Sequence, residues 1–129
     1  MLKNGILNPA INSLLSRVRH TNTLVIADRG FPFWPQIETV DISLVDDVPR
    51  VLDVLRAIRS NFAIDKAFMA EEFLASNWPA TREDFERELS GIPITFEPHT
   101  DFKKRVPGAI GLIRTGETLQ YANLIIQSG

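Results

Sequence analysis

Two histidines are the residues of this chain best suited to proton transfer, because imidazole is the side chain that gives and takes a proton near neutral pH. His20 lies between a helical pattern and an apolar run, and His99 follows a short run typical of a strand. Each is equally compatible with a role as a loop or capping residue. General acid/base catalysis and a structural role therefore both stay open for each histidine.

Asp28 ends the apolar run of residues 23–27, so its carboxylate can cap the next turn or accept hydrogen bonds from ligand hydroxyls. The loop of residues 29–35 that follows contains Phe31, Phe33 and Trp34. Because aromatic side chains on a loop are costly to leave in water, they indicate a core plug, an oligomer contact or a stacking face for a sugar.

Several common reaction types lack their motifs here. The chain has no phosphate-binding or dinucleotide-binding glycine loop, no H-E-x-x-H and no G-x-S-x-G. With zero cysteines it also lacks disulfides, thiolate metal sites and cysteine nucleophiles. Glu71 and Glu72 could form a carboxylate site, although the helix dipole alone favours acids in a first turn. We expect neither a metal nor another cofactor.

Length and composition predict one globular domain over residues 1–129, with 44% hydrophobic and 23% charged residues. The net charge of −2 is unfavourable for binding a nucleic acid backbone. No apolar run approaches the roughly 18 residues that a membrane span needs, and the first residues lack the apolar region of a secretory signal. The sequence therefore predicts a cytoplasmic protein with no nucleic acid or membrane partner.

Hydrophobic periodicity predicts that strands and helices alternate along the chain. The expected helices cover 9–19, 47–58, 71–76, 81–90 and 100–106, and the expected strands cover 23–27, 38–44, 64–70, 93–97, 109–115 and 122–127. Asn8, Asp47 and Thr81 are the expected caps of the first, second and fourth helices. This order predicts an α/β fold, a single-domain three-layer sandwich whose central sheet is mostly parallel, with an antiparallel exception at the C-terminal strand pair.

Ligands of such sheets bind beyond the carboxyl ends of the strands. That rule selects Asp28 with the loop after it, and His99 after the strand of residues 93–97.

Five stretches together resemble the D-ribose pyranase and L-fucose mutarotase family, and they span nearly the whole chain. They are HTNTLVIADRGFP (20–32), VDISLVDDVPRVLDVLRAI (40–58), AEE (70–72), PHTDFK (98–103) and IRTGETLQYANLII (113–126). The most specific features are the seven residues between His20 and Asp28 and the Gly-Glu pair 116–117 followed by Tyr-Ala-Asn. The ribose branch is more similar than the fucose branch, although Arg29 and the bulky loop after it depart from the ribose-type pattern.

The resemblance implies an isomerase that interconverts the cyclic forms of a free aldose such as D-ribose or L-fucose, without a cofactor. It makes His20 the general acid/base. It assigns sugar binding to Asp28, His99, Lys103, Tyr121, Ala122 and Asn123. A non-catalytic sugar-binding or transport-accessory protein and a metal-free nuclease are the alternatives, and the acidic balance disfavours the nuclease.

One distance conflicts with a site inside a single chain. A strand rises about 3.3 Å per residue, so a strand over 23–28 separates His20 from Asp28 by on the order of 15–20 Å. Either the strand starts later and the chain doubles back, or the two residues meet only loosely, or a neighbouring subunit completes the site. The family resemblance implies a ring-like homo-oligomer with sites at subunit contacts and with Tyr121 to Asn123 supplied across the interface.

Overall fold

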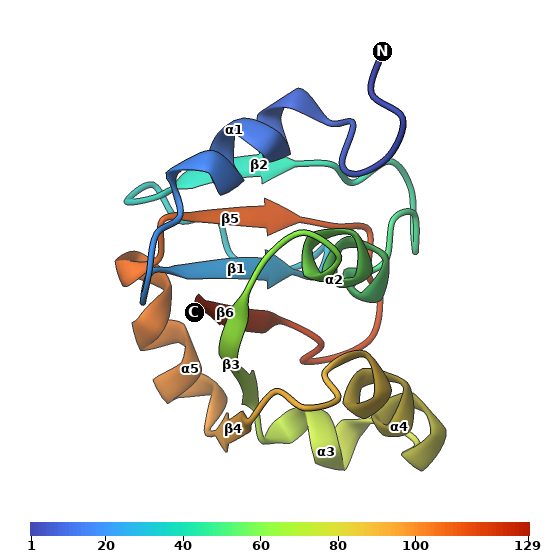
Figure 1. Cartoon of the computed structure of the whole chain (residues 1–129). Helices are drawn as coiled ribbons and strands as arrows, with labels where there is room; N and C mark the ends of the chain where they lie inside the picture. The colour runs from blue at the N-terminus through green and yellow to red at the C-terminus, as the bar shows by residue number, and fades with distance from the viewer.

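The computed structural model describes residues 1–129 and contains one six-stranded sheet in the order β2-β5-β1-β6-β3-β4 (Figure 1). The strands are β1 (Thr23–Ala27), β2 (Glu38–Asp41), β3 (Ile64–Ala70), β4 (Ile94–Glu97), β5 (Gly111–Arg114) and β6 (Leu124–Ser128). The pairs β1·β5, β2·β5 and β3·β4 are parallel, whereas β6 is antiparallel to both of its neighbours, β1 and β3. The predicted α/β fold with a mostly parallel sheet is confirmed.

Helices cover both faces of this sheet, which gives three layers. They are α1 (Pro9–Arg17), α2 (Val51–Arg59), α3 (Glu72–Ser76), α4 (Pro79–Glu88), α5 (His99–Arg105) and the short 3-10 helix η1 (Val106–Gly108). Alternate side chains of β1 enter different cores: Leu24 and Ile26 pack with α1, α2 and α4, and Val25 packs with α5 on the other face. No helix combines the length and the apolar character needed to cross a membrane.

Local side-chain chemistry explains where two helices begin. The Asn8 side chain accepts a hydrogen bond from the Ile11 N–H at 3.0 Å, as predicted for the cap of α1. In α2 the predicted cap is wrong: the helix begins at Val51, and the Asp53 carboxylate accepts from the Arg50 N–H at 2.8 Å. Asp47 has φ +63° and lies in the preceding loop, outside the helix.

The start of α4 also differs from the prediction. The helix begins at Pro79, two residues before Thr81, because proline suits a first helical position, where its missing N–H needs no partner. The helix ends at Glu88, and Gly91, two residues after the C-cap Leu89, has φ +80°, a left-handed conformation that favours glycine after a helix.

The last two strands do not pair with each other. β5 lies parallel between β2 and β1, and β6 crosses to the other side of β1 and runs antiparallel. The N-terminal end of β6 therefore lies at the same edge as the C-terminal ends of the other five strands, and we call this the carboxyl edge of the sheet. Asp28, His99 and the segment from Tyr121 to Asn123 all come to this edge.

Candidate active site

A cavity of about 350 Å³ opens at the carboxyl edge of the sheet. It is lined by Asp28, Gly30, Phe31, Pro32, His99, Gln120, Tyr121 and Asn123. Four of the residues predicted from the sequence to bind sugar are thus brought together by one chain. Of the other four, Gly30, Phe31 and Pro32 belong to the loop after Asp28 that the sequence had selected as a whole, and Phe31 was singled out there as an aromatic residue. Gln120 was missed and carried no signal.

Asp28 is held by the turn that leaves β1. Its Oδ1 accepts from the Gly30 N–H at 3.0 Å, and its own N–H donates to the Asn123 side-chain oxygen at 2.8 Å. Burial raises the pKa of the Asp28 carboxyl above its usual value, although hydrogen bonds from Gly30, Asn123 and Phe31 and the charge of Arg114 oppose this rise. Asp28 therefore combines a turn-forming role with a carboxylate that faces the cavity.

His99 begins α5, and its N–H donates to both carboxylate oxygens of Glu72 at 3.1 Å. Glu72 thus caps α5, which supports the structural interpretation of the Glu71-Glu72 pair. Burial and the neighbouring Lys103 charge lower the pKa of His99, against the opposite effects of Glu72 and Asp28. The lowered pKa favours the neutral imidazole, and its buried Nδ1 has no protein partner.

Tyr121 lies edge-on against His99, with their ring centres 5.1 Å apart. It has φ +57°, a left-handed conformation that reverses the chain before β6. The Asn77 side chain donates to the Gln120 carbonyl at 2.9 Å and to the Phe73 carbonyl at 3.0 Å, which fastens this turn to α3. The segment 73–77 therefore supports the wall of the cavity from outside.

The remaining predicted sugar-binding residues lie beside the cavity. Ala122 is fully buried in the core on the α1 and α2 face of the sheet, so only its main chain is near the lining residues. Lys103 lies one helical turn after His99 and is half-buried without lining the cavity.

His20 lies at the opposite edge of the sheet. It is exposed in the turn before β1, where the neighbouring Thr21 N–H donates to the Ser128 carbonyl at 3.0 Å. The strand does not start late or double back, so His20 and Asp28 of one chain do not share a site. By contrast, Tyr121 and Asn123 line the same cavity as Asp28 within one chain, so an interface is not needed to bring these three residues together. Their supply across an interface to His20 of another copy stays a prediction.

The aromatic loop divides into three environments. Phe31 is buried and lies edge-on against His99 and Phe102. Trp34 packs against the core on the α5 face of the sheet, whereas Phe33 is 71% exposed. Arg29 forms an ion pair with Asp46 at 2.7 Å on the surface. Phe31 is the only one of these residues that lines the cavity.

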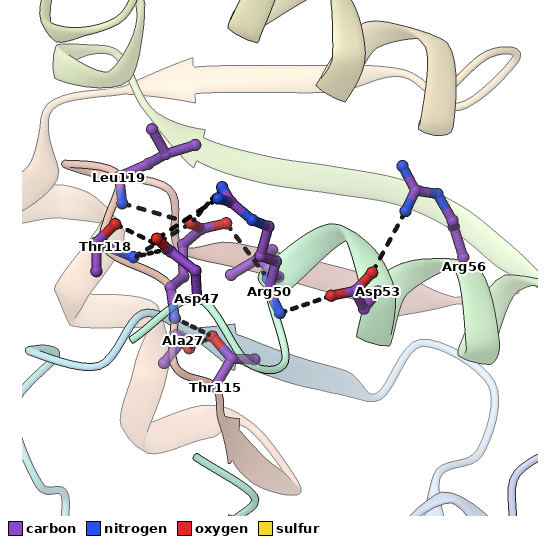
Figure 2. Close-up of polar contacts among 10 residues, drawn as sticks. Ala27, Asp47, Arg50, Asp53, Arg56, Thr115, Thr118 and Leu119 are labelled. Carbon is purple, nitrogen blue, oxygen red and sulfur yellow. Dashed lines mark hydrogen bonds and ion pairs between the residues drawn. The ribbon is translucent and has the colours of Figure 1, made fainter. Parts of the chain in front are cut away.

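A buried acid, Glu117, braces the segment between β5 and β6, and Figure 2 shows Asp47, Arg50, Thr118 and Leu119 around it. The Glu117 side chain is 1% exposed, and its carboxylate accepts from the main-chain N–H groups of Thr118 at 3.2 Å and Val51 at 3.4 Å. Arg50 Nη1 lies 3.6 Å from the same carboxylate, and Asp47 accepts from the Thr118 hydroxyl at 2.7 Å. Burial raises the pKa of Glu117. These contacts tie the start of the Tyr121 turn to α2.

Gly116 permits the closest approach in this brace, and we expect Gly116→Ala to destabilise the protein by about 1–3 kcal/mol through overpacking. A methyl group there overlaps the Val45 carbonyl oxygen and lies 2.9 Å from the Val48 oxygen. Urea unfolding measures the loss. Gly108→Ala is the matched control, because a methyl group at Gly108 meets nothing within 4 Å. Equal stability of the two variants would contradict the close packing around Gly116.

No group of three or more His, Cys, Asp or Glu side chains has the arrangement of a metal site. The cavity instead combines a carboxylate, an imidazole, a phenol and two amides. Together these groups can donate to and accept from several hydroxyls of one small polar molecule.

The fold and this cavity define a small α/β protein with a polar small-molecule site at the carboxyl edge of its sheet. The sequence pattern of the RbsD / FucU transport protein family matches residues 1–129, and the chain belongs to that family. The resemblance inferred from the sequence is thereby confirmed.

Individual relatives match over almost their whole length. The chain is 40% identical to a D-ribose pyranase of Geobacillus thermodenitrificans over 129 residues, which are 100% of this chain and 97% of the relative. The structure of Bacillus subtilis RbsD complexed with D-ribose matches with a TM-score of 0.93 at 35% identity, covering 100% and 98% of the two chains. A fucose mutarotase from Streptococcus pneumoniae in complex with L-fucose shares the fold, with a TM-score of 0.84 at 21% identity and coverage of 99% and 98%.

Proposed function

We propose that this protein is an isomerase that interconverts the cyclic forms of a free aldose, with D-ribose as the first substrate to test. The observation that carries the proposal is the cavity in which Asp28, His99, Tyr121 and Asn123 converge. Its volume of about 350 Å³ falls within the usual range of small-molecule sites, about 300–1,000 Å³. The names of the relatives, D-ribose pyranase among them, support the same class of enzyme.

The reaction needs no catalysis beyond a general acid and a general base. A base removes the proton of the anomeric hydroxyl, the bond between the anomeric carbon and the ring oxygen breaks, and an acid protonates that ring oxygen. Another hydroxyl, or the same one from the other face, then closes the ring, and both protons return. A positioned acid or base accelerates such steps by about 10²–10⁴-fold.

Asp28, Tyr121 and Asn123 offer hydroxyl partners in this proposal, and the neutral His99 can accept or donate a hydrogen bond. Lys103 and the main chain of Ala122 stand at the border of the site. We assign the moving proton to His20 of a second copy of the chain. The family resemblance makes His20 the general acid/base. His20 is exposed and lies at the opposite edge of the sheet from the cavity of its own chain, so a second copy would have to bring it to the site.

The proposed homo-oligomer, a ring with sites at subunit contacts, agrees with the exposed apolar surface. Leu44, Val45 and Val48 in the loop before α2 are 77%, 62% and 47% exposed. Apolar side chains grouped in this way commonly mark a contact between proteins. The cytoplasmic location stays a prediction from the sequence.

Saturation-transfer NMR tests the proposal on equilibrated D-ribose, L-fucose and other aldoses, with and without protein. We expect faster exchange between the pyranose, furanose and anomeric signals of at least one sugar. If one sugar binds but no sugar exchanges faster, the function is that of a sugar-binding or transport-accessory protein, and the proposal is wrong.

A further inference from the structure

Arg114 is a largely buried arginine at the end of β5 whose guanidinium reaches the loop after β1. Its side chain is 12% exposed. The Nη1 group donates to the carbonyls of Asp28 and Arg29, and Nη2 donates to the carbonyl of Pro32, each at 3.3 Å. One side chain therefore holds both ends of the 28–32 loop.

This loop forms half of the cavity wall. Asp28, Gly30, Phe31 and Pro32 are four of the eight lining residues. Two other hydrogen bonds hold the start of the loop. The Gly30 N–H donates to the Asp28 carboxylate within the loop, and the Arg29 N–H donates to the carbonyl of Glu117, outside the loop, at 3.0 Å. Neither of these bonds reaches the Pro32 end of the loop. A displacement of the loop would change the width of the cavity and the direction of the Asp28 carboxylate.

The charge of Arg114 is poorly neutralised elsewhere. Its nearest acid, Asp41, lies 3.9 Å away with a side chain that is 53% exposed, and such a pair is weak in water. The charged or titratable groups that face Asp28 are Arg114 from β5, His99 from α5 and Tyr121 from the turn before β6. Burial raises the pKa of Asp28, and Arg114 acts against that rise.

We propose that Arg114 is a positioning residue of the isomerase: its planar fork fixes the 28–32 loop as a wall of the sugar site, and its positive charge, held against the main-chain carbonyl of Asp28, acts on the Asp28 carboxylate. The inference rests on the proposed function. It goes beyond the groups that touch sugar, because Arg114 does not line the cavity and acts through the loop.

Lysine and methionine separate the two effects of Arg114. Lysine keeps the positive charge but replaces the fork of donors by a single ammonium group. Methionine fills a similar space with neither charge nor donors. Arg56→Lys is the matched control, because Arg56 is ion-paired to Glu88 at 2.7 Å between α2 and α4, away from the cavity.

We expect Arg114→Lys to raise the KM for D-ribose by about tenfold, because the 28–32 loop that binds the sugar is no longer held in place. The kcat should stay within about twofold, because the proposed acid/base, His20, is unchanged. The pH dependence should stay near that of the wild type. For Arg114→Met we expect the same rise in KM and a shift of the acidic limb of kcat/KM to higher pH, because the Asp28 pKa rises when the positive charge is removed. Arg56→Lys should match the wild type in both respects.

Carbon-13 NMR of the Asp28 carboxyl in sugar-free protein gives a readout that needs no turnover. A raised Asp28 pKa in Arg114→Met and an unchanged one in Arg114→Lys support the proposal. An unmoved pKa in Arg114→Met, or a wild-type KM in Arg114→Lys, overturns it. If Arg114→Met does not fold, Arg114→Lys alone decides through its KM. If the wild type accelerates ring exchange of no sugar, the proposed function fails, and the titration still reports whether Arg114 acts on Asp28.

Discussion

The His20→Ala variant is expected to lose catalysed ring exchange by about 10²–10⁴-fold, the contribution of one positioned acid or base. Its folding should be unaffected, because His20 is exposed in the turn before β1 and contributes nothing to either core. Saturation-transfer NMR measures the exchange rate, and urea unfolding measures the stability. Loss of both folding and activity would count against a catalytic role.

Mixing two inactive variants tests whether His20 serves the cavity of another copy. His20→Ala keeps an intact Asp28, and Asp28→Asn keeps an intact His20. In a randomly mixed oligomer about a quarter of the contacts unite both intact residues, so about a quarter of the wild-type activity should return. The assay is run at D-ribose concentrations below KM after the two variants are unfolded and refolded together.

Two results would contradict the shared site. If mixing restores no activity while each variant alone is inactive, His20 and Asp28 do not combine across a contact. If His20→Ala keeps the wild-type rate, the proton is carried by a group of the cavity itself, and the neutral His99 becomes the residue to replace. A monomeric protein with full activity in light scattering and assay would exclude the proposed oligomer.

The meeting of Asp28 and His99 could be predicted from the sequence, because both follow strands and parallel strands end at one edge. The position of Tyr121 and Asn123 could not. An apolar strand such as β6 carries the same side-chain pattern in either direction, so its reversed insertion between β1 and β3 has no sequence signal. That reversal is the physical reason why these two residues lie in the cavity of their own chain.

The loop after Asp28 could be selected from the sequence, but the main-chain contacts that shape it could not. Gly30 and Pro32 line the cavity as parts of a loop whose shape depends on carbonyl groups, and every residue has one. Arg114 and Asn77 act on such carbonyls from neighbouring elements.

Asp47 shows where a sequence pattern predicts the wrong contact. An acid before a helical pattern is typical of a cap, but the Asp47 carboxylate binds Thr118 instead.

Asp28→Asn is expected to weaken D-ribose binding by about 100-fold, because hydrogen bonds to a charged acceptor contribute about 1.5–3 kcal/mol. The carboxylate accepts from hydroxyls at both oxygens, whereas the amide replaces one acceptor by a donor. NMR titration with D-ribose measures the affinity. Asp84→Asn is the matched control, because Asp84 pairs with Arg87 on the exposed side of α4 and lies outside the cavity.

The same variant should keep the free energy of unfolding at neutral pH within about 1 kcal/mol of the wild type. Burial raises the folded-state pKa of Asp28 above its unfolded value, so the stabilising contribution is complete below the unfolded pKa and is lost as the pH rises through the folded pKa. Above the folded-state pKa the ionised Asp28 thus weakens the fold, and the uncharged amide of Asp28→Asn would remove that penalty while its oxygen still accepts from the Gly30 N–H. Urea unfolding at neutral and mildly acidic pH measures both values. Wild-type affinity together with lost stability would make Asp28 a turn residue only, whereas lost affinity with retained stability identifies a carboxylate kept for its ligand.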